Sequence, residues 1–199
     1  KYSEDAMLMG AEMAYTAKDY EKALHIYKQL KDKAASMERR QLAKTGMLRS
    51  AHMLGNEEEI IFTATDLLAD TKLAPELSNE AHYYRAKAYL DAGKTDGAME
   101  DLKILAKDTR NVYGAEAKYK VAQIYFDGGQ TDKAEQEVLN YIEVSTPHTY
   151  WLARSFVLLA DVYMKLGRNL DAKQYLLSLK QNYQADDDIA GMIESRLEK

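Results

Sequence analysis

The stretch AKYKVAQIYFDGGQTDKAEQEVLNYI, residues 117–142, contains the pattern that decides the fold. Apolar residues recur three and four positions apart on both sides of Gly129, beginning with Ala122 before it and Ala134 after it. These spacings place side chains on one face of an α-helix. Glycine ends a helix readily because it adopts a left-handed cap without steric penalty. The stretch therefore predicts two amphipathic helices, a helix A and a helix B, joined by a tight turn.

The helix B part of this pattern recurs five times. It is an apolar triplet with spacings of four and three, and its first members are Ala23, Ile60, Ala98, Ala134 and Ala172. The intervals between them are 37, 38, 36 and 38 residues. A constant period in the range of about 20–50 residues indicates a stacked array of structural repeats.

Other columns of the alignment keep the same offsets in every copy. Small residues stand twelve positions before the triplet, at Ala11, Leu48, Ala86, Ala122 and Ala160, where leucine is the exception. A turn position stands five before it, at Lys18, Gly55, Gly93, Gly129 and Gly167. Good N-cap types follow the turn, at Asp19, Asn56, Thr95, Thr131 and Asn169. Each unit therefore predicts two helices that approach closely through small side chains.

The sequence predicts an all-α, right-handed superhelical solenoid over residues 1–199. The expected repeats cover residues 4–36, 38–74, 76–110, 112–147 and 149–185. A further amphipathic helix over 186–199 is expected to cap the array, since terminal elements of solenoids need a polar outer face. The alternative is the first helix of a sixth unit. The chain begins at Lys1 without a signal-like segment, so we expect a piece of a longer protein.

The best copies resemble the tetratricopeptide repeat. That motif combines W-x2-L-G-x2-Y in its first helix with A-x3-F in its second. The matching segments are residues 117–125 with Gly129 and Ala134, and residues 155–163 with Gly167 and Ala172. The resemblance covers about residues 4–183 and implies a protein- or peptide-binding scaffold. The pattern is most similar to that of bacterial envelope-associated repeat proteins, which implies a soluble protein of the periplasm, envelope or cytoplasm.

The chain departs from the motif at several positions. The tryptophan position carries Met7, Lys44, His82, Lys118 and Phe156. The leucine position of the third unit carries Arg85. The second unit has Leu48 and Ile60 where small residues are expected, so its two helices are predicted to lie further apart.

Composition excludes several classes of function. The net charge is −5, which disfavours nucleic acid, including the RNA that pentatricopeptide proteins of similar period bind. No stretch approaches the roughly 20 apolar residues of a membrane span, so direct membrane insertion is not expected. The chain has no cysteine, which excludes disulfides and thiolate metal sites and fits both oxidising and reducing compartments. We expect a monomer.

No catalytic, cofactor or metal site is predicted. The four histidines, His25, His52, His82 and His148, are not spaced as ligand pairs. Metalloprotease, phosphate-loop and serine hydrolase motifs are absent. The acidic run Glu57-Glu58-Glu59 follows a cap residue, where carboxylates meet the positive end of a helix dipole, and is interpreted as a helix start. The sequence therefore predicts no enzymatic activity.

Binding is predicted at a concave groove lined by the first helices. The candidate residues occupy positions beside the buried columns: Tyr15, Arg49, His52, Tyr83, Lys87, Tyr119, Gln123, Phe126, Asp161 and Met164. Aromatic anchors contribute more to binding than scattered charges. The alternative for the tyrosines at 83 and 119 is ordinary core packing between neighbouring helices.

The groove positions also bear on the kind of partner. The resemblance to chaperone-binding repeats implies a Lys and Asn set that grips a terminal carboxylate, and this set is absent. The chain has Glu12, Arg49, Lys87, Gln123 and Asp161 at these positions, of which Arg49 and Lys87 suit a local basic spot. The alternative function is a rigid architectural spacer within a larger protein.

The small-residue columns give a first testable prediction. Ala134→Leu should overpack the contact between helix A and helix B and lower the free energy of unfolding by about 1–3 kcal/mol. Urea denaturation measures the change. An Ala134→Leu protein as stable as the parent would contradict close packing at this column.

Overall fold

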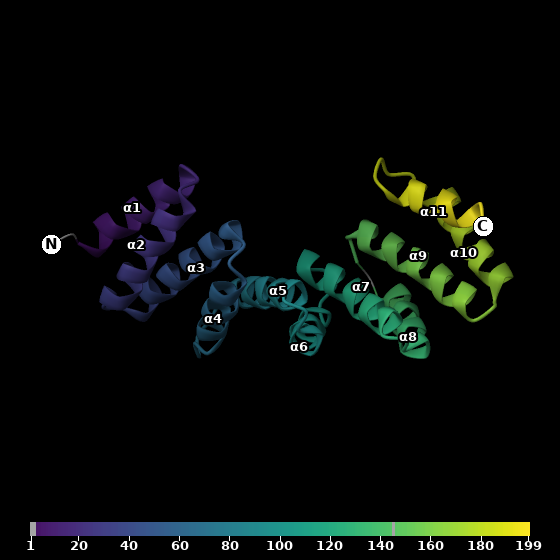
Figure 1. The fold of residues 1–199 in the computed structure, drawn as a ribbon, viewed down its shortest axis with the longest axis horizontal. Coiled ribbons are helices and arrows are strands. Elements are labelled where there is room, and N and C mark those ends of the chain that lie inside the picture. Colours follow the sequence, from purple (N-terminus) through teal and green to yellow (C-terminus); the bar gives the residue numbers. More distant parts are fainter. Residues whose placement is uncertain (1–2, 145) are drawn as a thin grey trace. The chain divides into compact units, whose positions relative to one another are not determined.

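The computed structural model describes residues 3–144 and 146–199, and these residues form eleven α-helices and no strand (Figure 1). The helices are α1 (Glu4–Thr16), α2 (Tyr20–Lys33), α3 (Met37–Leu54), α4 (Glu57–Leu68), α5 (Pro75–Asp91), α6 (Thr95–Leu105), α7 (Val112–Asp127), α8 (Thr131–Glu143), α9 (Thr149–Lys165), α10 (Asn169–Asn182) and α11 (Ile189–Leu197). The odd-numbered helices from α1 to α9 are helices A, and the even-numbered ones are helices B. The all-α prediction is confirmed.

The chain divides into two compact units, Lys1–Asp101 and Leu102–Lys199, with the boundary inside α6. In the first unit α2 packs against α1 and α3, and α4 packs against α3 and α5. In the second unit α8 packs against α7 and α9, while α10 packs against α9 and α11. Neighbouring helices A also contact each other within each unit. Helix α1 contacts α3 in the first unit, and α7 contacts α9 in the second. The organisation as one solenoid domain remains a prediction.

The core of each helix pair is built from the columns of the repeat. All five residues of the small-residue column and all fifteen of the triplets are buried. The larger Leu48 and Ile60 of the second pair are buried with them, at 0% and 4% exposed. The periodicity therefore identified the faces on which helices A and B meet.

The turn between helices A and B has the same backbone conformation in all five pairs. Lys18, Gly55, Gly93, Gly129 and Gly167 all have φ between 62° and 77°, in the left-handed region. Lys18 is the one residue other than glycine with positive φ among residues 3–144 and 146–199. A side chain at such a φ costs about 1–2 kcal/mol relative to a right-handed conformation. The first turn is thus strained where the other four are not.

The predicted N-caps are correct in two of the five pairs. Asp19 accepts a hydrogen bond from the amide of Lys22, and Asn56 accepts one from Glu59. Helices α6, α8 and α10 instead begin at Thr95, Thr131 and Asn169 themselves. The caps of α8 and α10 are the preceding Gln130 and Arg168, whose side chains make no capping bond. The prediction was wrong there because every helix B begins two residues after the turn position, and in these three pairs the capping-type residue stands at that helical position instead of one residue before it.

The three central pairs contain a polar bridge where the motif has tryptophan. The ammonium of Lys44 lies 3.3 Å from Asp66 and 3.0 Å from Asp70. The ammonium of Lys118 lies 3.2 Å from Glu137 and 2.7 Å from the amide oxygen of Asn140. In each case a cation on helix A meets acceptors on helix B of the same pair or, for Asp70, just after it. The apolar Met7 and Phe156 occupy this position in the end pairs.

The bridge of the third pair is centred on Asp101, whose side chain is 1% exposed. Because a carboxylate only accepts, Nδ1 of His82 donates to it over 2.7 Å. Arg85 donates to both of its oxygens, at 2.7 and 2.8 Å, and also bonds Thr65 of α4. The arginine at the motif's leucine position is therefore the partner of a buried carboxylate.

Burial would raise the pKa of Asp101, but the hydrogen bonds from His82 and Arg85 outweigh it and hold the pKa below its usual value. A carboxyl whose pKa falls on folding stabilises the folded state at pH values above the unfolded pKa, about 3.9. That stabilisation is lost as the pH falls from there through the lower, folded-state pKa.

The strained first turn gives a prediction. Lys18→Gly should raise the free energy of unfolding by about 0.5 kcal/mol, because the relief of strain exceeds the added entropy of the unfolded chain. Lys22→Gly, at a helical position in the first turn of α2, is the matched control and should lower the free energy of unfolding, by less than the roughly 1 kcal/mol of a helix interior. Destabilisation by both substitutions in urea melts would contradict the left-handed conformation at Lys18.

The buried carboxylate gives another prediction. Asp101→Ala should lower the free energy of unfolding by about 3 kcal/mol at pH 7, because it leaves Arg85 without its partner. The difference from the parent should shrink below about pH 4, where the parent loses the same charge. Urea denaturation of the parent and the variant at pH 7 and pH 3 measures this difference in the free energy of unfolding. An equal difference at both pH values would show that packing, and not charge, is the cause.

Candidate functional site

A hollow in the first compact unit brings together positions predicted for the groove. Its volume is about 410 Å³. It lies between α1 and α3, with a tyrosine of α2 as a further wall, and we call it the α1–α3 groove. Its lining residues are Leu8, Glu12, Tyr15, Thr16, Tyr27, Leu42, Thr45, Gly46 and Arg49. Two of the candidate residues, Tyr15 and Arg49, therefore share one cavity.

The shape of the α1–α3 groove depends on a close contact at Gly46. A Cβ atom at this position would overlap the ring of Tyr27, which is itself buried. The absence of a side chain lets the α2 tyrosine reach the floor of the groove. Tyr15 is held from the other side by an edge-on contact with Tyr20, with ring centroids 5.2 Å apart. The aromatic walls are thus fixed by packing.

The charge of Arg49 is matched by a carboxylate of the next helix A. Its guanidinium donates to both oxygens of Glu80 on α5, over 2.7 and 2.9 Å. This hydrogen bonding raises the pKa of Arg49. The expected basic spot of Arg49 and Lys87 is therefore reduced, and the ammonium of Lys87 lies over the ring of Tyr83, 5.5 Å from its centroid. Burial raises the pKa values of Tyr15 and Tyr27, which remain neutral donors.

His52 extends the same surface toward α5. Its ring stacks on Tyr84 with centroids 4.3 Å apart and an interplanar angle of 28°. Burial, and after it Lys87, lower the pKa of His52, so the ring is neutral at pH 7. The rings of Tyr83 and Tyr84 lie 5.8 Å apart. His52 is therefore a member of an aromatic group and not a charged contact.

In the second compact unit the candidate residues contact the protein's own side chains. Tyr119 is 6% exposed, with its ring 5.7 Å from that of Trp151. Its hydroxyl donates to Gln123 and accepts from Arg154, over 2.8 and 2.9 Å. The guanidinium of Arg154 also covers its ring. Tyr119 thus belongs to the packed contact between α7 and α9, as the core alternative proposed.

The remaining candidates of this unit are partly covered. The ammonium of Lys165 lies 5.2 Å from the ring centroid of Phe126. Asp161 accepts two hydrogen bonds from Arg196 of α11, over 2.7 and 2.8 Å. Met164 lies beside them in a smaller hollow of about 370 Å³. Helix α11 therefore occupies the last part of the predicted strip.

Several contributors to these sites were not predicted. They are Glu80, Tyr84, Trp151, Arg154 and Arg196. Glu80 stands 31 residues after Arg49, and Arg154 stands 35 residues after Tyr119, each about one repeat further along the chain. Because the period is 36–38 residues, a search along the next helix A, up to two turns before the equivalent position, would have found both pairs.

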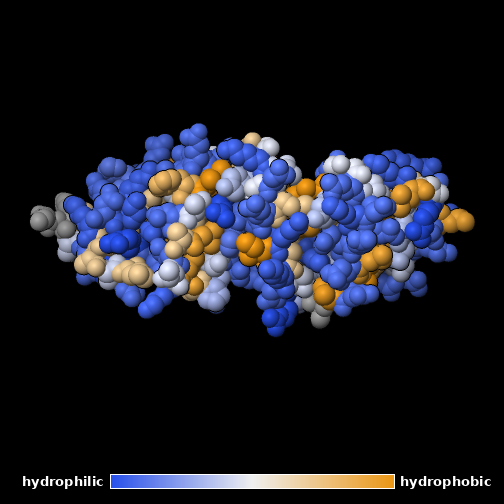
Figure 2. Space-filling view, turned by 90° about the horizontal axis from the view of Figure 1, so that it is seen from below, coloured by the Kyte–Doolittle hydropathy of each residue, from blue (hydrophilic) through white to orange (hydrophobic). Residues whose placement is uncertain are grey.

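Exposed apolar side chains also occur outside the groove. Figure 2 shows hydrophobic groups scattered over a mainly hydrophilic face. Phe62 on α4 and Leu170 on α10 are 62% and 80% exposed. Single exposed apolar residues are normal on soluble proteins and do not mark a site.

Sequence comparison places the fold in a known family. Two segments, residues 80–108 and 153–181, match models of the tetratricopeptide repeat. The chain contains tetratricopeptide repeats. The matched segments lie on α5 with α6 and on α9 with α10. No curated protein sequence matches this repeat protein significantly.

Solved structures share the fold of this repeat protein. MamA superposes with a TM-score of 0.67 at 16% identity, over 92% of this chain and 96% of that one. Repeats of a putative kinesin light chain from Podosopora anserina superpose with a TM-score of 0.61 at 18% sequence identity, over 89% of this chain and 93% of that one. TTC0263, a thermophilic TPR protein of Thermus thermophilus, superposes with a TM-score of 0.52 at 19% sequence identity, over 99% of this chain and 100% of that one. At these identities the likeness concerns the fold alone.

Among residues 3–144 and 146–199 no helix has the length and apolar character needed to cross a membrane. Within the same residues no group of three or more His, Cys, Asp and Glu side chains is placed to hold a metal ion.

Proposed function

We propose that this protein is a scaffold that binds a protein or peptide through the inner face of its helices A, without catalysis. The observation that carries the proposal is the α1–α3 groove, a cavity of about 410 Å³ lined by two of the predicted inner residues, Tyr15 and Arg49. Family membership supports the same role. The expected monomeric state, the absence of nucleic acid partners and the soluble, envelope or cytoplasmic location remain predictions of the sequence.

The chemistry of the α1–α3 groove favours an apolar or aromatic anchor on the partner. Leu8, Leu42, Tyr15 and Tyr27 provide its apolar walls. The pairing of Arg49 with Glu80 removes the strongest local charge, so a single terminal carboxylate is a poor ligand. Glu12 and the hydroxyl of Tyr15 remain to orient a peptide backbone. We therefore propose an extended segment whose large apolar side chain enters the groove, since such anchors dominate interface energies.

Capture of partners tests the proposed groove. The immobilised 199-residue protein is incubated with a lysate of its source, and retained proteins are quantified by mass spectrometry. A groove variant, Tyr15→Ala with Leu42→Ala, is expected to retain about tenfold less of a specific partner, which corresponds to about 1.4 kcal/mol. A control variant, Phe62→Ala with Met53→Ala, removes exposed apolar side chains outside the groove and is expected to behave as the parent.

The outcomes separate the candidate functions. Equal retention by parent and groove variant would reject the α1–α3 groove as the site. A further variant, Tyr83→Ala with Phe126→Ala, then asks whether the inner positions of α5 and α7 bind instead. Retention of no protein by any variant would favour the rigid spacer function. Thermal melting of each variant by circular dichroism checks that loss of binding is not loss of folding.

A further inference from the structure

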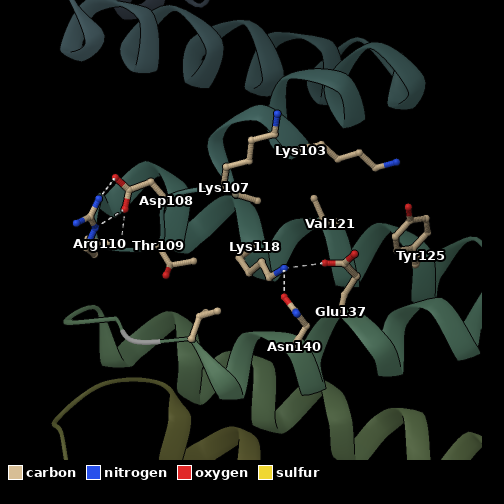
Figure 3. Close-up of a pocket in the computed structure, with 12 residues that line it drawn as sticks. Lys103, Lys107, Asp108, Thr109, Arg110, Lys118, Val121, Tyr125, Glu137 and Asn140 are labelled. Atoms are coloured by element: carbon tan, nitrogen blue, oxygen red, sulfur yellow. Dashed lines mark hydrogen bonds and ion pairs between the residues drawn. The ribbon is translucent and has the colours of Figure 1, made fainter.

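A second cavity lies in the second compact unit, where the end of α6 and the following turn meet α7 and α8 (Figure 3). Its volume is about 630 Å³ and all of its lining residues lie within Leu102–Lys199. We call it the α6–α8 pocket. On α7 it uses Lys118, Val121 and Tyr125, which lie more than a third of a turn, about 130°, around the helix from the groove candidates. The pocket is therefore separate from the proposed groove surface.

The α6–α8 pocket carries a net positive charge in an acidic protein. Four cations and two carboxylates line it: Lys103, Lys107, Arg110, Lys118, Asp108 and Glu137. The local net charge is thus +2, against −5 for the whole chain. Concave surfaces lined mainly by one sign of charge concentrate ligands of the opposite sign.

The excess charge has a source in the repeat pattern. Asn140 and Asp66 occupy equivalent positions, each six residues after the first member of its triplet and close to the end of its helix B. In the second pair the ammonium of Lys44 meets two carboxylates. In the fourth pair Lys118 meets Glu137 and the neutral amide of Asn140. Replacement of a carboxylate by an amide leaves the lysine of this pocket with one anionic partner fewer.

The rim of the α6–α8 pocket is held in place by hydrogen bonds. The hydroxyl of Thr146 donates to the carbonyl of Thr109 over 2.7 Å, and Nε2 of His148 lies 2.9 Å from the carbonyl of Arg110. Asp108 accepts from the backbone amide and the guanidinium of Arg110. The bonds of Thr146 and His148 fix the turn after α6 to the segment before α9, and those of Asp108 hold the turn itself. A site whose walls are fixed in advance loses less entropy when a ligand binds.

The walls of this pocket are not uniformly polar. Val121 and Val144 contribute apolar surface, and Lys103 extends toward Tyr125 with its ammonium 5.6 Å from the ring centroid (Figure 3). A small inorganic anion would use the cations and leave this apolar surface uncovered. An acidic peptide, in contrast, presents both carboxylates and apolar atoms. We propose that the α6–α8 pocket binds an acidic peptide segment of a partner protein.

The test uses a defined probe. A fluorescein-labelled peptide of the sequence GEEVEEG is titrated with the full 199-residue protein, and binding is followed by fluorescence anisotropy at low salt. The pocket variant is Lys103→Glu with Lys107→Glu. The control is Lys22→Glu with Lys33→Glu, which makes the same change of net charge at exposed positions of α2. A peptide with glutamine in place of every glutamate measures binding that does not depend on charge.

We expect the parent and the control variant to bind the acidic peptide with similar affinity, and the pocket variant to bind at least about tenfold more weakly. Binding should weaken as salt is added, because solvent-exposed charges are screened. Circular dichroism melts establish that both variants are folded. Because the substitutions differ from those used for the groove, failure here does not affect the groove proposal.

Four results would overturn the proposal. They are no binding by the parent, equal binding by parent and pocket variant, equal binding of the glutamine peptide, and displacement of the peptide by phosphate. For the last, about 10 mM phosphate is compared with chloride at the same ionic strength, so that general screening is held constant. Displacement by phosphate alone would identify a free oxyanion as the ligand.

Discussion

The close contact between helix A and helix B, made through alanine, is the constraint on which the rest of this structure depends. Without bulky side chains between them the two helices can approach at the short end of the usual interaxial range. The left-handed turn at Gly129 and its equivalents then returns the chain at once for the second helix. Because every pair is closed in this way, its remaining surfaces are free to face neighbours or ligands, and both proposed binding sites occupy them.

Much of the fold was predictable because small residues and glycine leave few options. A triplet such as Ala134, Val138 and Tyr141 can be buried together only on one face of a helix. All three residues are buried in the structure. Helix starts were harder: every helix B begins two residues after the turn position, which places Asn56 at the cap but Thr131 inside the helix. Side-chain type alone did not reveal this, whereas the constant offset from the turn does.

The binding surface was less predictable, since it depends on which side chains the protein uses for itself. Tyr15 lines a cavity, whereas Tyr119, another candidate on a helix A, is enclosed by Trp151 and Arg154. Both tyrosines were predicted to face the groove, although Tyr15 stands eight residues and Tyr119 fifteen residues before the triplet of its repeat. The side chains that enclose Tyr119 come from the next helix A, so they become visible only when successive helices A are considered together. The same applies to Arg49, whose charge is balanced from α5.

The polar bridges have a consequence for how the chain folds. An array of near-identical hairpins can pair a helix A with a helix B from the wrong repeat, a recognised failure of repeat proteins. Here Lys44 requires two carboxylates, His82 and Arg85 require one that is buried, and Lys118 requires a carboxylate beside an amide. A mismatched hairpin would bury a charge without its partner, which is costly. The polar bridges therefore favour pairing of each helix A with the helix B of its own repeat.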